Sequence, residues 1–268
     1  MRLIAFDNAG VPTMAASEGD ILRPLAPLAD FYADPDGYRG AEGGDPIDRA
    51  DVVAVPPVPT TAKILCIGLN YPLHIAETNS ERPAHPNLFA RWWSTLSVDG
   101  GGCAVPPGEE GLDFEAELAV IIGREMHAVD EADAMAGVLG YTCFNDISAR
   151  RFQRATSQWA LGKNADDSAP IGPVIVTADE LGDPMGLRIG SRLNGETMQD
   201  STTDQMIFGI AETIAYITQA LTLRPGDVIA TGTPDGVGSR REPPLLMTAG
   251  DTIEVDIEGI GVLTTHIT

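Results

Sequence analysis

The pattern of apolar and polar positions along the chain predicts many short strands and few helices. Apolar or alternating runs rich in β-branched residues and bounded by turn formers are typical of strands. Such runs occupy residues 2–6, 64–68, 115–122, 173–177, 187–193, 197–201, 228–231, 252–257 and 262–267. Residues 206–221 carry apolar side chains at helical spacing. The pattern therefore predicts an α+β chain that is mostly β, rather than a doubly wound sheet.

The first 58 residues differ in pattern from the rest. After the strand 2–6 come small and turn-forming residues, a short apolar stretch at 28–32, and then segments rich in glycine and proline. Such segments are typical of loops and linkers. We therefore expect a small N-terminal domain, residues 1–58, joined by a proline-rich linker to a larger domain, residues 59–268.

Composition and charge narrow the classes of function. Among the 268 residues 43% are hydrophobic and 21% charged, as in ordinary soluble proteins. No apolar run is long enough to span a membrane, and the N-terminus lacks the apolar segment of a secretory signal, so we expect a cytoplasmic protein. The net charge of -22 argues against binding to nucleic acid or to an anionic membrane. The three cysteines, Cys66, Cys103 and Cys143, are expected to be reduced, buried and inert.

The segment 112–123 contains three carboxylates at alternate positions. Side chains alternate between the two faces of a strand, so Asp113, Glu115 and Glu117 share one face while Phe114 and Leu118 face a core. Carboxylates about 7 Å apart repel one another unless water or a cation screens them. The segment is therefore either a solvated strand face or part of a site for a hard divalent cation, which prefers carboxylate oxygens.

A second cluster lies at 145–153. A helix capped by Asn145 or Asp146 would place Asp146, Arg150 and Gln153 on one face. An acceptor, a cation and an amide in line suit a charged, oxygenated ligand. An exposed helix with an Asp–Arg pair is the alternative.

A third cluster follows the strand 64–68. Pro72 suits a first helical position, and His74 and Glu77 would then lie three residues apart on that helix. A carboxylate beside an imidazole fixes its tautomer and raises its basicity, which is what activation of a water requires. A surface pair on a short helix is the alternative. The glycines of 231–238 indicate either a phosphate-binding loop or a tight turn.

These clusters belong to a set of seven motifs. In chain order the motifs are Gly-Leu-Asn-Tyr-x-x-His-x-x-Glu, Asp-x-Glu-x-Glu-Leu, Asn-Asp-x-Ser-x-Arg, Lys-x-x-x-x-x-x-Pro-x-Gly-Pro, Leu-Asn-Gly-Glu, Gln-x-x-x-Thr-x-x-Met-Ile-Phe and Pro-Gly-Asp-x-Ile-x-Thr-Gly-Thr-Pro-x-Gly-Val-Gly. Over about residues 60–268 the chain resembles the fumarylacetoacetate hydrolase family, in particular its acylpyruvate hydrolase and 2-hydroxyhepta-2,4-diene-1,7-dioate isomerase members. The resemblance implies a β-rich roll around a metal ion and a homodimer.

The resemblance also implies roles for single residues. Glu115, Glu117 and Asp146 would bind one Mg²⁺ or Mn²⁺ ion, with Ca²⁺ as a further possibility. His74 and Glu77 would lie on a lid and activate water, Arg150 and Gln153 would stabilise oxyanion charge, Lys163 would support the metal cluster, and Tyr71 and Thr233 would contact substrate.

The function implied is metal-dependent hydrolysis of a C–C bond in a 3-acylpyruvate or related 1,3-dicarbonyl acid. The partner would be a small anionic 2-oxo acid or 1,3-diketone, and not nucleic acid or a membrane. The alternatives are decarboxylation of oxaloacetate, and isomerisation or hydration of a 2-oxo acid through the same enolate. A non-catalytic dicarboxylate-binding protein is a third class.

The chain departs from the family pattern at a few positions. Arg91 stands where family members usually carry lysine, and Ala165 stands where an aromatic residue is expected. Trp92, Trp93 and Trp159 could form an apolar wall for an acyl group or pack in a core. These departures leave the metal ligands unchanged and concern the substrate.

Overall fold

Seventeen strands form two sheets in the computed structural model, which describes residues 1–268. The larger sheet has 12 strands in the order β4-β3-β2-β1-β12-β11-β10-β15-β6-β7, with β5 added beside β1 and β8 beside β12. The smaller sheet has five strands in the order β14-β13-β16-β17-β9. Helices are few and short, so the predicted α+β, mostly β fold class is confirmed.

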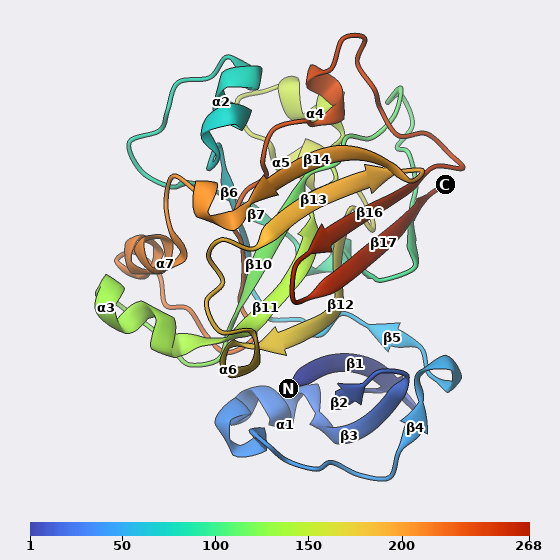
Figure 1. Cartoon of the computed structure of the whole chain (residues 1–268), viewed down its shortest axis with the longest axis vertical. Helices are drawn as coiled ribbons and strands as arrows, with labels where there is room; N and C mark the ends of the chain where they lie inside the picture. The colour runs from blue at the N-terminus through green and yellow to red at the C-terminus, as the bar shows by residue number, and fades with distance from the viewer.

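The larger sheet holds most of the chain. Its strands are β1 (Arg2–Asn8), β2 (Val11–Glu18), β3 (Ile21–Pro27), β4 (Ile47–Asp48), β5 (Ala54–Val55), β6 (Ile64–Gly68), β7 (Asn87–Arg91), β8 (Leu96–Val98), β10 (Ala116–Ile122), β11 (Val138–Asn145), β12 (Ala169–Thr177) and β15 (Val228–Ala230). Figure 1 shows β10, β11 and β12 side by side through the middle of the molecule.

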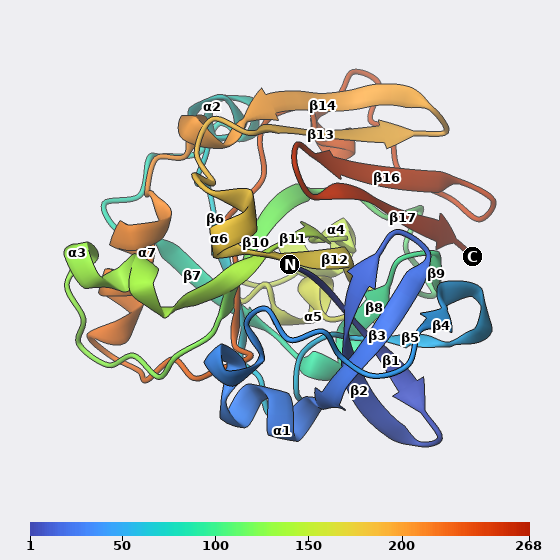
Figure 2. The same cartoon turned by 60° about the horizontal axis from the view of Figure 1, so that its bottom comes forward.

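The smaller sheet is built mainly from the C-terminal residues. Its strands are β9 (Gly101–Cys103), β13 (Arg188–Leu193), β14 (Glu196–Thr202), β16 (Thr252–Ile257) and β17 (Gly261–Ile267). Asn194 and Gly195 join β13 to β14, and both have positive φ angles, 51° and 83°, as the predicted hairpin turn requires. In Figure 2 this sheet lies over β10, β11 and β12.

The helices are short, with four to nine residues each. They are α1 (Leu28–Ala33), α2 (Pro72–Thr78), α3 (Glu131–Ala134), α4 (Arg150–Arg154), α5 (Ala160–Lys163), α6 (Ala178–Leu181) and α7 (Ile210–Thr218). The predicted helix at 206–221 is the shorter α7, which begins after Gly209. None of these helices is long and apolar enough to cross a membrane.

Strand β10 is buried on both faces. Leu118 and Val120 pack in the core between the two sheets, whereas Ala119 and Ile121 pack in the core on the side of the N-terminal strands. Because side chains alternate along a strand, Glu115 and Glu117 point to the same side as Ala119 and Ile121. The two carboxylates therefore lie inside the protein.

The N-terminal residues contain more strand than the sequence pattern predicts. The region after the first strand, which the pattern indicates as turn-forming, folds as β2 and β3, with Met14 and Leu22 fully buried. Strand β1 pairs antiparallel with β12, so the larger sheet continues across the predicted boundary at residue 58 (Figure 1). The division into two domains stays a prediction.

Candidate metal and substrate site

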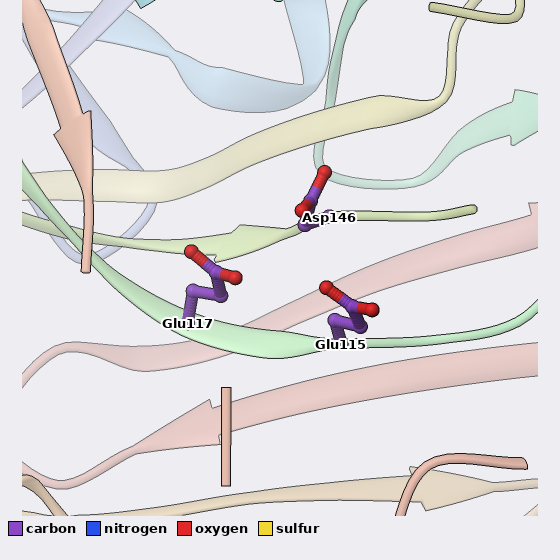
Figure 3. A group of neighbouring side chains, drawn as sticks. All are labelled: Glu115, Glu117 and Asp146. Carbon is purple, nitrogen blue, oxygen red and sulfur yellow. The ribbon is translucent and has the colours of Figure 1, made fainter. Parts of the chain in front are cut away.

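Three buried carboxylates meet where β10 begins and β11 ends. Glu115 directly precedes β10 and Asp146 directly follows β11, and the antiparallel register pairs Ala116 with Asn145. The Asp146 amide donates to the Glu115 carbonyl oxygen at 2.9 Å. Figure 3 shows Glu115 and Glu117 pointing from β10 toward Asp146; carboxylate oxygens of the three lie within 4.8 Å of one another. A solvated strand face, the alternative considered for this segment, is wrong because all three side chains are buried.

Asp113 does not join this group. One of its oxygens accepts a hydrogen bond from the Gly238 amide at 2.7 Å, and the other accepts from Arg150 Nε at 2.7 Å and from the Ser239 amide at 3.2 Å. Burial raises the pKa of Asp113, but the charge of Arg150 and the hydrogen bonds outweigh burial and lower it. Asp113 therefore anchors Arg150 and the 238–239 backbone.

Three cations surround the carboxylates. Lys163 Nζ donates to Glu115 at 2.8 Å and also to Asp146, and Arg150 donates to the other oxygen of Glu115. Arg91 Nε donates to Asp146. Burial raises the pKa of Glu115, but the charges of Lys163 and Arg150 prevail and lower it to about 2.

Glu117 has no cation bound to its carboxylate. It accepts one hydrogen bond, from the Gly232 amide at 2.9 Å. Burial raises its pKa well above the ordinary value, and the neighbouring charges of Asp146 and Glu115 raise it further. Glu117 is therefore the one carboxylate of the three whose charge is not compensated by a cation in contact with it.

The predicted helix over Asp146, Arg150 and Gln153 is wrong at its start. Asp146 follows β11 outside any helix, and α4 begins only at Arg150. The backbone of 146–148 instead forms hydrogen bonds with that of 113–115, including a β-bridge between Ser148 and Asp113. Arg150 nevertheless reaches the acid group, and its Nη1 donates to Gln153 Oε1 at 2.8 Å. Asp146 and Arg150 are therefore neighbours because both lie beside Glu115, and not because they share one face of a helix.

His74 and Glu77 pair as predicted on α2, which begins at Pro72. His74 Nδ1 lies 2.7 Å from Glu77 Oε1, and the second oxygen of Glu77 accepts from the Gly236 amide at 2.9 Å. Since a carboxylate only accepts, Nδ1 carries the proton and Nε2 is free to accept one. His74 is 7% exposed, so the alternative of a surface pair is wrong.

Backbone amides of the glycine-rich loop 231–238 donate hydrogen bonds to acidic side chains. Gly232, Gly236 and Gly238 donate to Glu117, Glu77 and Asp113 respectively. A Cβ on Gly236 would lie 2.4 Å from the Met198 carbonyl oxygen, and the φ angle of Gly236 is 98°, so only glycine fits there. The loop is thus a tight turn that holds three carboxylates in place.

One cavity of about 290 Å³ brings most of the predicted residues together. His74, Glu115, Glu117, Arg150, Gln153, Lys163 and Thr233 line it. Tyr71 does not, since it packs in the core with 1% exposure, and its hydroxyl has no hydrogen-bond partner. Glu77 and Asp146 lie behind the lining residues. The cavity joins a carboxylate group, an imidazole, cations and a hydroxyl.

Comparison with known proteins identifies the family. A family model for the C-terminal part of fumarylacetoacetate (FAA) hydrolase matches residues 63–268. The chain belongs to the fumarylacetoacetate hydrolase family. The resemblance indicated by the seven motifs is thereby confirmed, and members of this family are enzymes.

Relatives within the family catalyse different reactions. A mitochondrial oxaloacetate tautomerase of Bos taurus is 42% identical over 219 residues, 81% of this chain and 70% of that protein. The structure of 2-hydroxyhepta-2,4-diene-1,7-dioate isomerase from Mycobacterium marinum is similar with a TM-score of 0.82 and 32% identity, covering 100% of this chain and 98% of that one. Maleylpyruvate hydrolase from Sphingobium sp. SYK-6, in complex with manganese(II) and pyruvate, has a TM-score of 0.82 and 28% identity, with coverages of 100% and 99%.

The acid group of this family member fits a divalent cation. It offers oxygen donors from three carboxylates, the set that Mg²⁺, Mn²⁺ and Ca²⁺ prefer. Burial raises the pKa of Glu117, repulsion from Asp146 and Glu115 raises it further, and a cation would relieve this repulsion. The donors and their electrostatics therefore agree with a metal site.

Two residues of the site had no role assigned from the sequence. Arg91, the departure from the family's usual lysine, also donates to Ser168 Oγ at 2.9 Å and to the Ile147 carbonyl, so it holds Asp146 and does not line the cavity. Gln199 is buried; it accepts from the Ala116 amide at 3.0 Å and donates to Thr233 Oγ1 at 2.8 Å. Gln199 is the first residue of one of the seven motifs, and this is the only feature of the sequence that could have indicated a role for it.

Trp159 and Trp93 divide between the two alternatives left open, and Trp92 fits neither. Trp159 lines the cavity and packs edge-on against Phe89. Trp93 donates to the Val58 carbonyl at 3.1 Å and packs against the N-terminal core, while Trp92 is exposed. The three cysteines are free and buried, as predicted.

We expect Asp113→Asn to destabilise the protein by about 3 kcal/mol at pH 7, because it removes one partner of a buried ion pair. The folded-state pKa of Asp113 is lowered, so its stabilisation is present above the unfolded pKa near 4 and is lost as the pH falls toward the folded value. Urea unfolding at pH 7 and at about pH 3 measures the difference from the parent protein, which should shrink at the lower pH. Asp45→Asn, at an exposed position, is the control. An equal loss at both pH values would contradict the account.

Proposed function

We propose that this protein is a metal-dependent hydrolase that cleaves a C–C bond in a 3-acylpyruvate or related 1,3-dicarbonyl acid. The observation that carries the proposal is the His74–Glu77 pair, whose imidazole lines the same cavity as the carboxylate group. A base beside an electrophile-binding centre is what water attack on a carbonyl requires.

Glu115, Glu117 and Asp146 would hold Mg²⁺ or Mn²⁺. The bound cation would act as a Lewis acid on the oxygens of the 2-oxo acid and stabilise the enolate charge that develops as the C–C bond breaks. Glu77 holds the proton on His74 Nδ1, so Nε2 takes the proton of the attacking water.

The other cavity residues position and stabilise the substrate. Gln153 Oε1 is bound by Arg150, which leaves the Gln153 amide hydrogens free to donate to an oxyanion. Thr233 Oγ1 accepts from Gln199, so its hydroxyl hydrogen is free to donate to a substrate carboxylate. Tyr71, behind the cavity, is proposed to reach substrate only after the segment that carries α2 moves.

Oxaloacetate tautomerisation is the second candidate. It is favoured by the 42% identity to a mitochondrial oxaloacetate tautomerase of Bos taurus over 81% of this chain. Keto–enol exchange needs a proton moved at carbon, which His74 Nε2 could do without attack by water. Decarboxylation of oxaloacetate or isomerisation of a 2-oxo acid would use the same enolate.

Turnover of acetylpyruvate and of oxaloacetate, each with Mg²⁺, Mn²⁺ or a chelator, tests the proposal. Metal-dependent formation of pyruvate and acetate from acetylpyruvate would support hydrolysis. Loss of the enol absorbance of oxaloacetate without release of carbon dioxide, and no cleavage of acetylpyruvate, would replace it with tautomerisation. Release of carbon dioxide from oxaloacetate alone would replace it with decarboxylation.

The proposal includes the homodimer that the family resemblance implies. Light scattering coupled to size-exclusion chromatography distinguishes a dimer from the 28.3 kDa monomer. A mass equal to one chain would contradict the proposed homodimer and leave the proposed hydrolysis unaffected.

A further inference from the structure

Leu69, between β6 and α2, has an unfavourable backbone conformation. Its φ angle is 59°, in the left-handed region that is unfavourable for residues with a Cβ and rare for bulky ones. Every other non-glycine residue with a positive φ angle is an alanine, an asparagine or an aspartate. Leu69 is therefore the only large apolar residue of the protein in this conformation.

The two neighbours of Leu69 impose this conformation. Gly68 ends β6 against the indole of Trp159, and a Cβ on Gly68 would lie 2.8 Å from Trp159 Cζ3. Asn70 is fully buried; its Nδ2 donates to two backbone carbonyl oxygens, and its Oδ1 accepts from a backbone amide at 2.8 Å. The chain must therefore turn at Leu69 between two fixed residues. Backbone strain of this kind persists only where the surrounding structure imposes it, and it is common at functional sites.

The side chain of Leu69 lines the cavity without a partner in the core. It is half-buried, and it neither belongs to nor packs against any of the four hydrophobic clusters. A Cβ on Gly232 would lie 2.8 Å from the Ile67 carbonyl oxygen and from the Asn70 Cβ, so Leu69 flanks the loop whose Gly232 amide binds Glu117. A ligand in the cavity is the remaining apolar partner for this side chain.

We propose that Leu69 is a specificity-determining residue that packs against the carbon chain of the substrate. The rest of the apolar lining comes from Ile67, Phe89, Trp159 and Val237. The substrate class is then a 2-oxo acid with apolar carbons beyond C4, which leave water on binding. This inference rests on the proposed function in one respect, that the 2-oxo acid end binds at the carboxylate group.

Binding of a homologous series to the Mn²⁺-loaded protein tests this inference without turnover. The probes are pyruvate, 2-oxobutanoate, 2-oxopentanoate and 2-oxohexanoate, which differ only in the number of methylene groups. By calorimetry we expect the affinity to rise about threefold for each added methylene that is buried. Leu69→Ala and Leu69→Gly should each remove most of this rise and leave the affinity for pyruvate unchanged.

Thermal unfolding of the metal-free protein separates this role from a structural one. Leu69→Gly relieves the left-handed strain whereas Leu69→Ala keeps it, so the glycine variant should unfold about 2 °C above the alanine variant. A leucine of the core would instead give two strongly destabilised variants. Ala9→Gly is the matched control, because Ala9 has a φ angle of 52°, is exposed and does not line the cavity. It should raise the unfolding temperature and change no affinity.

Equal affinity of the parent protein for all four probes would overturn the inference, as would a Leu69→Ala variant that weakens pyruvate as much as 2-oxohexanoate. Strong destabilisation of both Leu69 variants with the graded series retained would assign the side chain to the core instead. Graded binding that depends on Leu69, without cleavage of any 1,3-dicarbonyl acid, would support the inference and refute the hydrolase. Absence of binding by all four probes would overturn the inference, and turnover of acetylpyruvate then decides the hydrolase separately.

Discussion

Exchange of Glu115 for glutamine is expected to abolish turnover and to abolish stabilisation by Mg²⁺ or Mn²⁺ at the same time. Burial raises the pKa of Glu115, but the charges of Lys163 and Arg150 prevail and lower it to about 2, so Glu115 is ionised and ready to bind a cation at any physiological pH. At a metal concentration 100 times the dissociation constant, binding stabilises the parent protein by about 2.7 kcal/mol. The variant should show almost none of this gain.

The comparison must be made with and without metal in each protein. Glutamine at 115 leaves Lys163 and Arg150 with less compensation, so the metal-free variant will itself be less stable. Thermal unfolding with Mn²⁺ and with chelator isolates the metal effect from this loss. Glu110→Gln, which removes the same charge at an exposed position, should keep the full metal effect. A normal metal shift in Glu115→Gln would remove the metal site from the account.

The strands were predictable where their signal is local. The hydrophobic runs at 64–68 and 252–257 correspond to β6 and β16, and Asn194-Gly195 forms its turn, because alternation and turn chemistry lie in neighbouring residues. Strand β11 was not predicted, although it is entirely buried. Gly140 interrupts its apolar run, and the place of the strand is fixed by pairing with β10 and β12.

The site was predictable by residue type but not by geometry. Glu115, Glu117 and Asp146 are gathered as the motifs imply, yet Asp146 arrives from the end of a strand and not from a helix. The roles of Arg91 and Asp113 depend on contacts with residues 55 and 37 positions away. No local pattern carries such contacts, so only the tertiary structure shows that these side chains orient the acid group.

Exchange of His74 for glutamine is expected to separate the reactions that the family can perform. Hydrolysis of acetylpyruvate should fall by about 10²- to 10⁴-fold, the usual contribution of a general base. Decarboxylation of oxaloacetate needs no activated water and should change by far less. Metal-induced stabilisation should stay at the parent value, because His74 is not one of the three carboxylates and glutamine keeps much of its volume.

Glu77→Gln tests the position of the imidazole separately from its chemistry. Glu77 is bound by the Gly236 amide and by His74 Nδ1, so its loss leaves the base present but its tautomer unfixed. We expect a smaller loss of hydrolysis than in His74→Gln, appearing in kcat and not in KM. His85→Gln, an exposed histidine stacked on Tyr216, is the control and should leave every rate unchanged. If His74→Gln lowers hydrolysis and decarboxylation equally, the histidine serves a step common to both reactions, and water activation is no longer its role.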